Sequence, residues 1–335
     1  MQLLKQQKNF LRINSRPNNT RSVRWPLPPW NVVVVVARTG TLNGKNGIVM
    51  ADELMANAVA NGFKDSSDLI SSVQVVSSEE EIEKDIHVVF MMHWLPESKA
   101  WKTIGDRPAW LWIQNASVIN DLSILKVRAE KIQGLWHAGK KTSSRLNLNF
   151  WEFGVEDTEV FKPQEKTARI VYVGNSVMHQ NSIMLIGKFC NEFKEKFFLF
   201  GSGWDHFGLP NNGILPMSLA GYEIGKSYVA LDTVSQEHIN EGMCSTRIFQ
   251  AMACETAVVT MQPKDNIPAW AIPYMTFAED ESDALRKAAK LLGDPIERSI
   301  KTNGSRKAAL NYSIKNAAKI KWMDIENSIN SMIRR

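Results

Sequence analysis

Runs of apolar residues alternate with amphipathic stretches along the first half of the chain. The run "NVVVVVA" at 31–37 is short and β-branched, as expected of a strand that is buried on both faces. A polar loop follows, and the stretch 48–62 then has helical spacing that ends at Gly62. Further strands are predicted at 73–76, 86–92 and 109–114, and the segments 131–139 and 149–155 complete this half. This alternation is typical of a parallel sheet with helices on both sides.

The same alternation starts again after a polar, charged segment around Pro163, with a strand predicted in "RIVYVG" at 169–174. The helix predicted at 181–196 has one apolar face, because its apolar residues recur every three or four positions: Ile183, Ile186, Cys190 and Phe193. The other elements predicted here are strands at 197–201, 228–234 and 257–260 and helices at 246–254 and 282–292.

A last amphipathic stretch at 312–333 has the spacing of one helix face, through Ile314, Ala318, Trp322, Ile325 and Ile329. The pattern therefore divides the chain into a tail at 1–24, a first domain at 25–163, a second at 164–311 and a final helix at 312–335. Both domains are predicted to be Rossmann-like α/β folds. Because open α/β sheets bind ligands beyond the carboxyl ends of their strands, we expect the chemistry in a cleft between the domains.

Composition agrees with a globular protein of two domains. At 335 residues the chain is too long for one ordinary domain, and 44% of its residues are hydrophobic and 22% charged. The longest apolar run, at 32–37, is far shorter than the roughly 20 residues of a membrane span. The N-terminal residues lack the apolar segment of a secretory signal, so a soluble, cytoplasmic protein is expected.

The cysteines give no sign of a disulfide framework or of a zinc site. There are three, an odd number, and none of them forms a CxxC pair: Cys190, Cys244 and Cys254. No structural metal is expected.

Positive charge is concentrated at the N-terminus. The net charge is +5, and residues 1–24 contain no acid but include Lys5, Lys8, Arg12, Arg16, Arg21 and Arg24. Such a segment is either a solvated tail or a contact for a polyanion such as DNA, RNA or anionic lipid. Net charge alone does not decide between the two.

The stretch "EGMCSTRIFQAMACETAVVT" at 241–260 carries the strongest candidate chemistry. Ser245 or Thr246 suits the N-cap of a helix that follows a strand. The free N–H groups and the positive dipole end of such a helix form a site for phosphate. Gly242 would let the backbone approach a ligand, and Arg247 would stabilise a diphosphate that gains charge as it leaves. The alternative is an ordinary capped helix whose arginine forms a surface ion pair.

Three phrases of the sequence resemble GT-B glycosyltransferases, most closely the spore-maturation-protein group of the family-1-like enzymes. The phrase "STRIFQAMACETAVVT" resembles their nucleotide-binding segment. "FWEFGVEDTEVFKP" is similar to the hinge phrase before their second domain, and "RIVYVGN" to that domain's first strand and glycine loop. The phrases keep the family's order and separations, and the resemblance extends over residues 105 to 310.

The sequence departs from the family pattern at two positions. Gln250 stands where the family usually has a glutamate that holds the nucleotide ribose, and an amide can still hydrogen-bond a diol. Arg247 and Gln250 are three residues apart and so share a helix face. Glu255 replaces the glycine of the family's Ala-Cys-Gly turn, so we expect this turn to be altered.

The resemblance implies an enzyme that moves a sugar from a nucleotide-diphosphate sugar, foremost a UDP-sugar, to a hydroxyl acceptor. It implies a GT-B fold, with two Rossmann-like domains facing a cleft and the last helix crossing back to the first domain. Arg247 and the helix N-terminus would take the place of a metal, so no metal and no further cofactor are expected. The residues implied in nucleotide binding are Gly174, Asn175, Gly201, Glu241, Gly242, Ser245, Thr246, Arg247 and Gln250.

Candidates for the acceptor side lie in the first domain. The loop at 38–47 does not match GxGxxG, which disfavours an NAD-dependent oxidoreductase. His93 and Asn115 follow predicted strands and would position the acceptor or the transferred sugar, although a histidine at a strand end often has only a structural role. In GT-B enzymes the equivalent loop closes over the donor phosphates or the acceptor, so the resemblance implies such a contact for Thr41, Asn43, Gly44 and Lys45; the alternative is a flexible polar turn.

Two further readings of function stay open at this stage. The basic tail and the 11 tryptophans are compatible with a nucleic-acid-binding protein without catalysis, which salt-sensitive DNA binding without sugar turnover would reveal. A glycosyltransferase that modifies a hydroxymethylated base in DNA would combine both properties.

Overall fold

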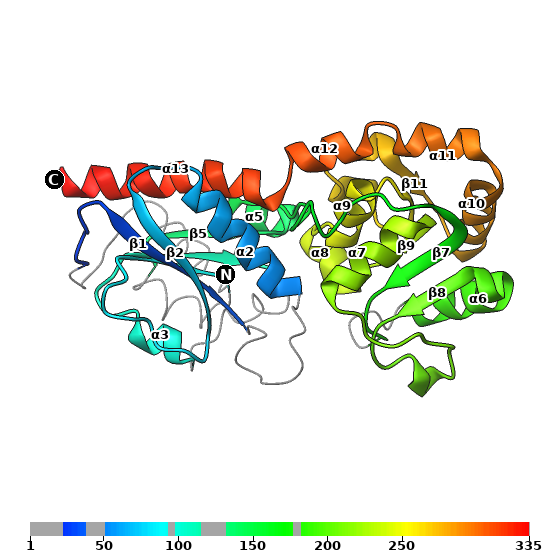
Figure 1. Ribbon diagram of the computed structural model, residues 1–335, viewed down its shortest axis with the longest axis horizontal. Coiled ribbons are helices and arrows are strands. Elements are labelled where there is room, and N and C mark those ends of the chain that lie inside the picture. Colours follow the sequence, from blue (N-terminus) through cyan, green and yellow to red (C-terminus); the bar gives the residue numbers. More distant parts are fainter. Residues whose placement is uncertain (1–22, 38–50, 93–97, 115–131, 177–181, 335) are drawn as a thin grey trace, which may run out of the picture. The chain divides into compact units, whose positions relative to one another are not determined.

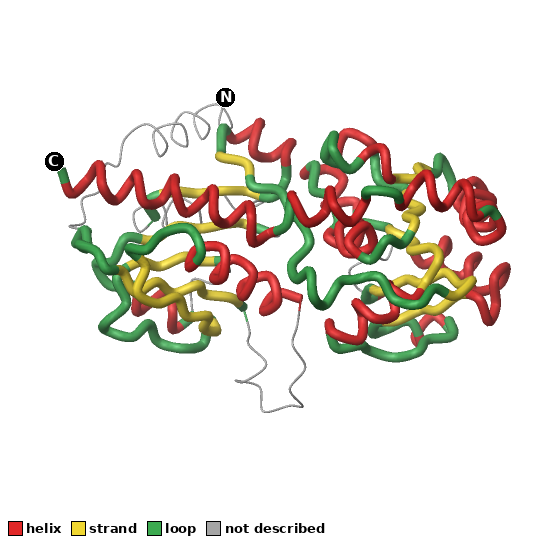
Figure 2. Tube along the Cα trace, turned by 45° about the horizontal axis from the view of Figure 1, so that its top comes forward, coloured by secondary structure: helices red, strands yellow, loops and turns green. Residues whose placement is uncertain are grey.

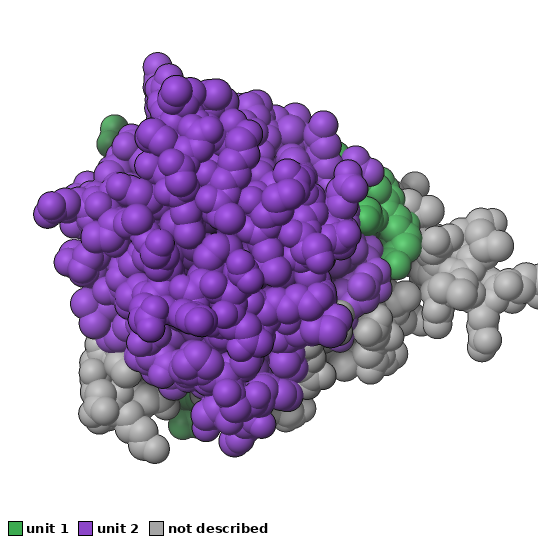
Figure 3. Space-filling model, turned by 90° about the vertical axis from the view of Figure 1, so that its right-hand side faces the viewer, with its two compact units in different colours: residues 1–152, 314–335 green, residues 153–313 purple. Residues whose placement is uncertain are grey.

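The computed structural model describes residues 23–37, 51–92, 98–114, 132–176 and 182–334. The chain forms two compact units, which Figure 3 colours separately: unit 1 contains residues 1–152 and 314–335, and unit 2 contains residues 153–313. Each unit contains a parallel β-sheet with helices packed against it, so the predicted α/β class with two Rossmann-like domains is confirmed. None of the helices in the described part of the chain has both the length and the apolar character of a membrane span.

The sheet of unit 1 has six parallel strands in the order β2-β1-β3-β4-β5-β6. The valines of the inner strand β1 are all buried, as its unbroken apolar run predicts. The strand bounds are β1 Trp30–Val36, β2 Ile70–Ser77, β3 Val88–Met91, β4 Ala109–Ile113, β5 Gly134–His137 and β6 Asn149–Phe150. Two short helices also belong to this unit, α3 Lys99–Thr103 and α5 Lys140–Leu146.

The last helix of the chain, α13 (Ile314–Ile333), belongs to unit 1 and runs alongside α2 (Ala51–Lys64), as Figures 1 and 2 show. Its predicted apolar face is completely buried: Ile314, Ala318, Trp322, Ile325 and Ile329. The prediction that Gly62 ends α2 is wrong, because the helix continues to Lys64. A Cβ at Gly62 would lie 2.4 Å from the carbonyl oxygen of Lys315, so this glycine permits close contact between the two helices.

The sheet of unit 2 has five parallel strands in the order β11-β10-β9-β7-β8. Four of them coincide with predicted apolar runs. The fifth, β11, has only three residues, too few for an apolar pattern to distinguish it from a loop. The bounds are β7 Thr167–Val173, β8 Phe197–Phe200, β9 Ser227–Asp232, β10 Ala257–Thr260 and β11 Met275–Phe277.

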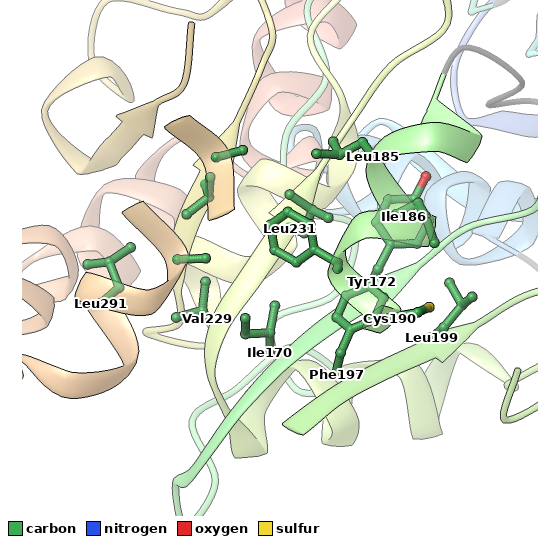
Figure 4. Close-up of a cluster of buried hydrophobic side chains, with 14 of the residues drawn as sticks. Ile170, Tyr172, Leu185, Ile186, Cys190, Phe197, Leu199, Val229, Leu231 and Leu291 are labelled. Carbon is green, nitrogen blue, oxygen red and sulfur yellow. The ribbon is translucent and has the colours of Figure 1, made fainter. Parts of the chain in front are cut away.

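Helices α6 (Ile183–Phe193) and α10 (Glu281–Gly293) pack on one face of this sheet, where Ile186 of α6, Leu291 of α10 and Ile170 of β7 belong to the apolar core drawn in Figure 4. The other α-helices of the unit are α7 Met217–Lys226, α8 Gln236–Glu241, α9 Thr246–Ala253, α11 Pro295–Thr302 and α12 Ser305–Asn311. Single turns of 3-10 helix occur at Lys194–Lys196, Asp205–Phe207, Lys264–Asn266 and Ile272–Tyr274.

The two units meet in sequence between residues 152 and 153 and again between 313 and 314. Pro163, the expected linker, therefore lies inside unit 2. The segment before it is held there by close packing and hydrogen bonds. A Cβ at Gly221 of α7 would lie 2.2 Å from the carbonyl oxygen of Val160, and Arg306 Nη1 donates to the carbonyl of Phe161 at 3.0 Å.

Candidate functional site

Helix α9 begins at the carboxyl edge of the sheet of unit 2, as predicted. Ser245 is its N-cap, and the Ser245 hydroxyl accepts from the N–H of Arg247 at 3.3 Å. The backbone N–H of Ser245 in turn donates to the side-chain carbonyl of Gln262 at 3.4 Å. The apolar face of α9, including Ile248 and Met252, is buried. The start of the helix is thus fixed by its cap and by burial of that face.

The guanidinium of Arg247 spans the carboxyl ends of the neighbouring strands β7 and β9. Its Nε donates to Asp232 Oδ1 at 3.3 Å, its Nη1 to the carbonyl of Val173 at 3.4 Å and its Nη2 to the carbonyl of Thr233. The group also lies over the ring of Tyr172, 5.2 Å from the centroid. Because Asp232 is 1% exposed, this is a buried anchor and not the surface ion pair considered from the sequence.

Asp232, the last residue of β9, organises the polar groups around this arginine. It also accepts hydrogen bonds from the Thr260 hydroxyl, at 2.8 Å, and from the side-chain amide of Gln262. One carboxylate therefore connects β9, the end of β10 and α9. Asp232, Thr260 and Gln262 were not predicted from the sequence, where the only signal for them is a polar side chain at the end of an apolar run.

Gly174 makes the position of Arg247 possible. A Cβ at Gly174 would lie 2.9 Å from Arg247 Nη1 and 3.1 Å from the ring of Tyr172. Gly201, at φ +132°, passes so close to the same loop that a Cβ would lie 2.0 Å from the carbonyl oxygen of Gly174. Asn175 joins the two loops, because its Oδ1 accepts from the N–H of Ser202 at 2.8 Å. These predicted residues form one tight edge beside the arginine.

Glu241 and Gly242 lie at the end of α8, the short helix after β9. Gly242 caps this helix with φ +72°, which explains the glycine without a ligand. Glu241 is buried. The same helix carries His238, whose Nδ1 lies 2.7 Å from the Ser235 hydroxyl. Burial and the charge of Arg247 lower the pKa of His238, which is a further candidate of this edge that the sequence analysis missed.

Gln250 contacts a carboxylate within unit 2. Its amide nitrogen donates to both carboxylate oxygens of Glu156, at 3.0 and 3.2 Å. The side chains are 94 positions apart in sequence and both residues are almost completely buried, with 4% and 3% exposed. The donor groups of Gln250 are therefore oriented toward the hinge phrase that contains Glu156.

Glu255, which stands at the glycine position of the Ala-Cys-Gly turn in the resemblance, directly follows the C-cap of α9. Glu255 has a φ of +51°, in the left-handed region that glycine favours. Its N–H donates to the carbonyl of Met252 at 3.1 Å, and the N–H of Thr256 donates to that of Ala251 at 2.9 Å. The exposed Glu255 side chain thus leaves the turn intact at the cost of backbone strain.

The candidates predicted in the first domain for contacts with phosphate, transferred sugar or acceptor lie outside the described residues. These are Thr41, Asn43, Gly44 and Lys45 of the first loop, together with His93 and Asn115. The first 22 residues, which contain most of the basic tail, also lie outside them. Within the described residues, no three His, Cys, Asp or Glu side chains are grouped so that they could hold a metal ion.

Comparison with known proteins agrees with this architecture. Residues 185–320 match the model of a family described as glycosyl transferase-like. The sequence matches none of the curated proteins with which it was compared.

Several solved structures have the same fold. Sucrose-phosphate synthase from Thermosynechococcus elongatus is 10% identical with a TM-score of 0.63, over 90% of this chain and 100% of that one. AviGT4, a glycosyltransferase involved in avilamycin A biosynthesis, is 12% identical with a TM-score of 0.60, over 90% and 99%. T4 phage BGT, solved with UDP-glucose, is 11% identical with a TM-score of 0.58, over 89% and 99%. The family match and the fold confirm the resemblance to GT-B glycosyltransferases.

Proposed function

We propose that this GT-B glycosyltransferase transfers the sugar of a UDP-sugar to a hydroxyl group and binds the nucleotide in unit 2. The observation that carries the proposal is Arg247, held by Asp232 beside the N-terminus of α9 at the carboxyl edge of the sheet. Parallel sheets bind ligands at this edge, and a helix N-terminus attracts phosphate. Similar structures contain UDP-glucose or UDP, which supports a uridine nucleotide.

In the proposed reaction, the acceptor oxygen forms a bond to the anomeric carbon while the bond from that carbon to the diphosphate breaks. The acceptor hydroxyl loses its proton, and the diphosphate leaves with the bonding electrons and gains negative charge. Arg247 and the first N–H groups of α9 would stabilise that charge. The loops after β7 and β8 would pack closely together through Gly174, Asn175 and Gly201. The missing side chain of Gly174 would leave room for the guanidinium of Arg247.

We also propose that these groups make a metal unnecessary. The permanent charge of Arg247 already supplies positive potential where the diphosphate would lie. A similar structure holds Mn²⁺ together with UDP, so the point needs a direct measurement. Turnover should persist at full rate in excess EDTA, and a strict dependence on added Mn²⁺ or Mg²⁺ would refute metal independence.

A hydroxymethylated base in DNA is the second candidate for the acceptor. One similar structure is described as the DNA-modifying enzyme β-glucosyltransferase, and another contains UDP and a 13-mer DNA with an HMU base. The six basic residues among the first 24 would give the attraction to phosphate that such an acceptor needs. His93 and Asn115 remain proposed contacts of the acceptor.

The test combines nucleotide binding with product analysis. Thermal-shift measurements with nucleoside diphosphates come first, since a ligand at 100 times its Kd stabilises a fold by about 2.7 kcal/mol. UDP-sugars are then incubated with DNA containing 5-hydroxymethylcytosine or with simple polyols, and products are identified by mass spectrometry. The exposed Arg286→Ala variant is the matched control for changes at Arg247. Salt-sensitive DNA binding without nucleotide binding would instead indicate a non-catalytic nucleic-acid-binding protein.

A further inference from the structure

His137, the last residue of β5 in unit 1, is completely buried and has a defined tautomer. The backbone N–H of Gly139 donates to its Nδ1 at 2.8 Å. Nδ1 therefore accepts and carries no proton, so the proton of the neutral ring is on Nε2. The contact of 3.2 Å between Nδ1 and the carbonyl oxygen of Gly139 is then not a hydrogen bond.

The Nε2–H of His137 is buried, and no acceptor for it lies among the described residues. A buried donor without a partner is uncommon in native proteins and calls for an explanation. The same condition recurs at Gln114, which directly follows β4 and whose buried amide nitrogen has no partner in the described part of the chain. Ile113 and His137 are level in the ladder of β4 and β5, so both donors lie where neighbouring parallel strands end.

The buried Nε2–H of His137 does not belong to a protonated, positively charged ring. Burial lowers the pKa of His137 to about 4, the backbone contact with Gly139 acts in the opposite direction, and the positive charge of Arg145 lowers the pKa further. The ring is therefore neutral at physiological pH and remains a donor at Nε2. With Nδ1 occupied by a backbone N–H, the ring has no free lone pair with which to accept a proton from a substrate.

We propose that the Nε2–H of His137 donates to an oxygen of the acceptor substrate at the carboxyl edge of the unit 1 sheet. His137 is then a positioning residue that selects a hydroxyl- or carbonyl-bearing acceptor, and it is not the base of the reaction. This inference rests on the proposed function. The inference concerns the acceptor site in unit 1, whereas the proposed nucleotide site is in unit 2. Nucleotide binding can therefore be measured separately.

His87 provides a matched control within the same unit. Its Nδ1 also accepts a backbone N–H, from Asn31 at 2.9 Å, but it directly precedes β3 at the opposite edge of the sheet. The variants are His137→Phe, which removes the donor, His137→Gln, which can restore one, and His87→Phe. The probes are a duplex with one 5-hydroxymethylcytosine and, separately, glycerol.

In wild-type protein with ¹⁵N-labelled histidine, NMR should show the His137 proton on Nε2, and one probe should shift that signal. His137→Phe should weaken binding of that probe by about 10- to 100-fold, as for a lost buried hydrogen bond, while UDP affinity stays unchanged. His137→Gln should recover part of the loss, and His87→Phe should lose none.

A signal unmoved by both probes, a proton on Nδ1, or an exchange peak with bound water alone would overturn the inference. Wild-type affinity for the probes in a folded His137→Phe variant would also overturn it. Because the NMR measurement uses the unchanged protein, it decides the matter even if the variants fail to fold. Absence of a thermal shift with UDP would instead count against the proposed function.

Discussion

Arg247 Nη1 lies 2.9 Å from the point that a Cβ on Gly174 would occupy. The atom that would have to give way is the far end of a flexible side chain, and the nearby ring of Tyr172 would need only a small shift. Gly174→Ala should therefore fold with a slightly lower Tm but displace the guanidinium from the proposed diphosphate position. We expect UDP affinity, measured by calorimetry, to fall about tenfold, as for one lost charge-assisted hydrogen bond.

Gly201→Ala is the contrasting variant for this prediction. Its Cβ would lie 2.0 Å from the backbone carbonyl oxygen of Gly174, at a φ of +132° that other residues rarely adopt. The backbone cannot yield as a side chain can, so this variant should be insoluble or should melt far below wild type. Equal melting temperatures for the two variants would contradict the packing described here.

Removal of Arg247 should affect both stability and turnover. The change to alanine leaves the buried carboxylate of Asp232 without its positive partner, which typically costs about 3 to 5 kcal/mol. The double variant Arg247→Ala/Asp232→Asn removes the orphaned charge and should recover much of the Tm. Its turnover of UDP-sugar should still be about 100- to 1000-fold below wild type, because the leaving diphosphate has lost its charge contact. Turnover within threefold of wild type in the double variant would exclude Arg247 from the site.

The difference between what the sequence predicts and what it leaves open is visible around α9. Ser245 and the apolar residues of α9 were predictable because capping and helical spacing depend on neighbours within a few positions. The partner of Gln250 is 94 positions away, and the hydrophobic pattern holds no information about which polar side chains meet across such a distance. Asp232 was missed for a related reason, since a single polar residue at a strand end looks the same whether or not it anchors an arginine.

Gln250→Glu, which introduces the glutamate that the resemblance to GT-B glycosyltransferases implies at this position, should destabilise this protein. Two carboxylates would then face each other in a buried site, and one of the two would have a raised pKa. When the pKa of a carboxyl group is higher in the folded than in the unfolded protein, the folded protein becomes less stable as the pH rises above the unfolded pKa. The Tm deficit relative to wild type should therefore be larger at pH 8 than at pH 5. Gln250→Leu adds no charge but removes both hydrogen bonds to the buried Glu156 carboxylate, so its deficit should also grow with pH, though less than that of Gln250→Glu.

Glu255→Gly should stabilise the protein. The residue has a φ of +51°, its N–H and the following turn bond do not involve the side chain, and glycine adopts this conformation without strain. We expect a gain of about 1 kcal/mol in the free energy of unfolding, measured by urea denaturation. Glu255→Ala removes the same carboxylate but keeps the strain, so it should show little or no gain. A similar gain in both variants would mean that charge, and not backbone conformation, is responsible.

Trp322 shows why the last helix of the chain is part of the first unit. Its ring is completely buried and packs against Trp30 and Phe63, with centroid distances of 6.0 and 5.2 Å. Trp322→Ala would leave a cavity in that core and should lower the free energy of unfolding by about 3 to 5 kcal/mol. Met323, the next residue of α13, is 59% exposed, so Met323→Ala should change stability by less than about 0.5 kcal/mol.

Deletion of residues 314–335 removes the whole buried face of α13 and should yield insoluble protein. A soluble, cooperatively melting truncation would show that the core of unit 1 does not depend on α13.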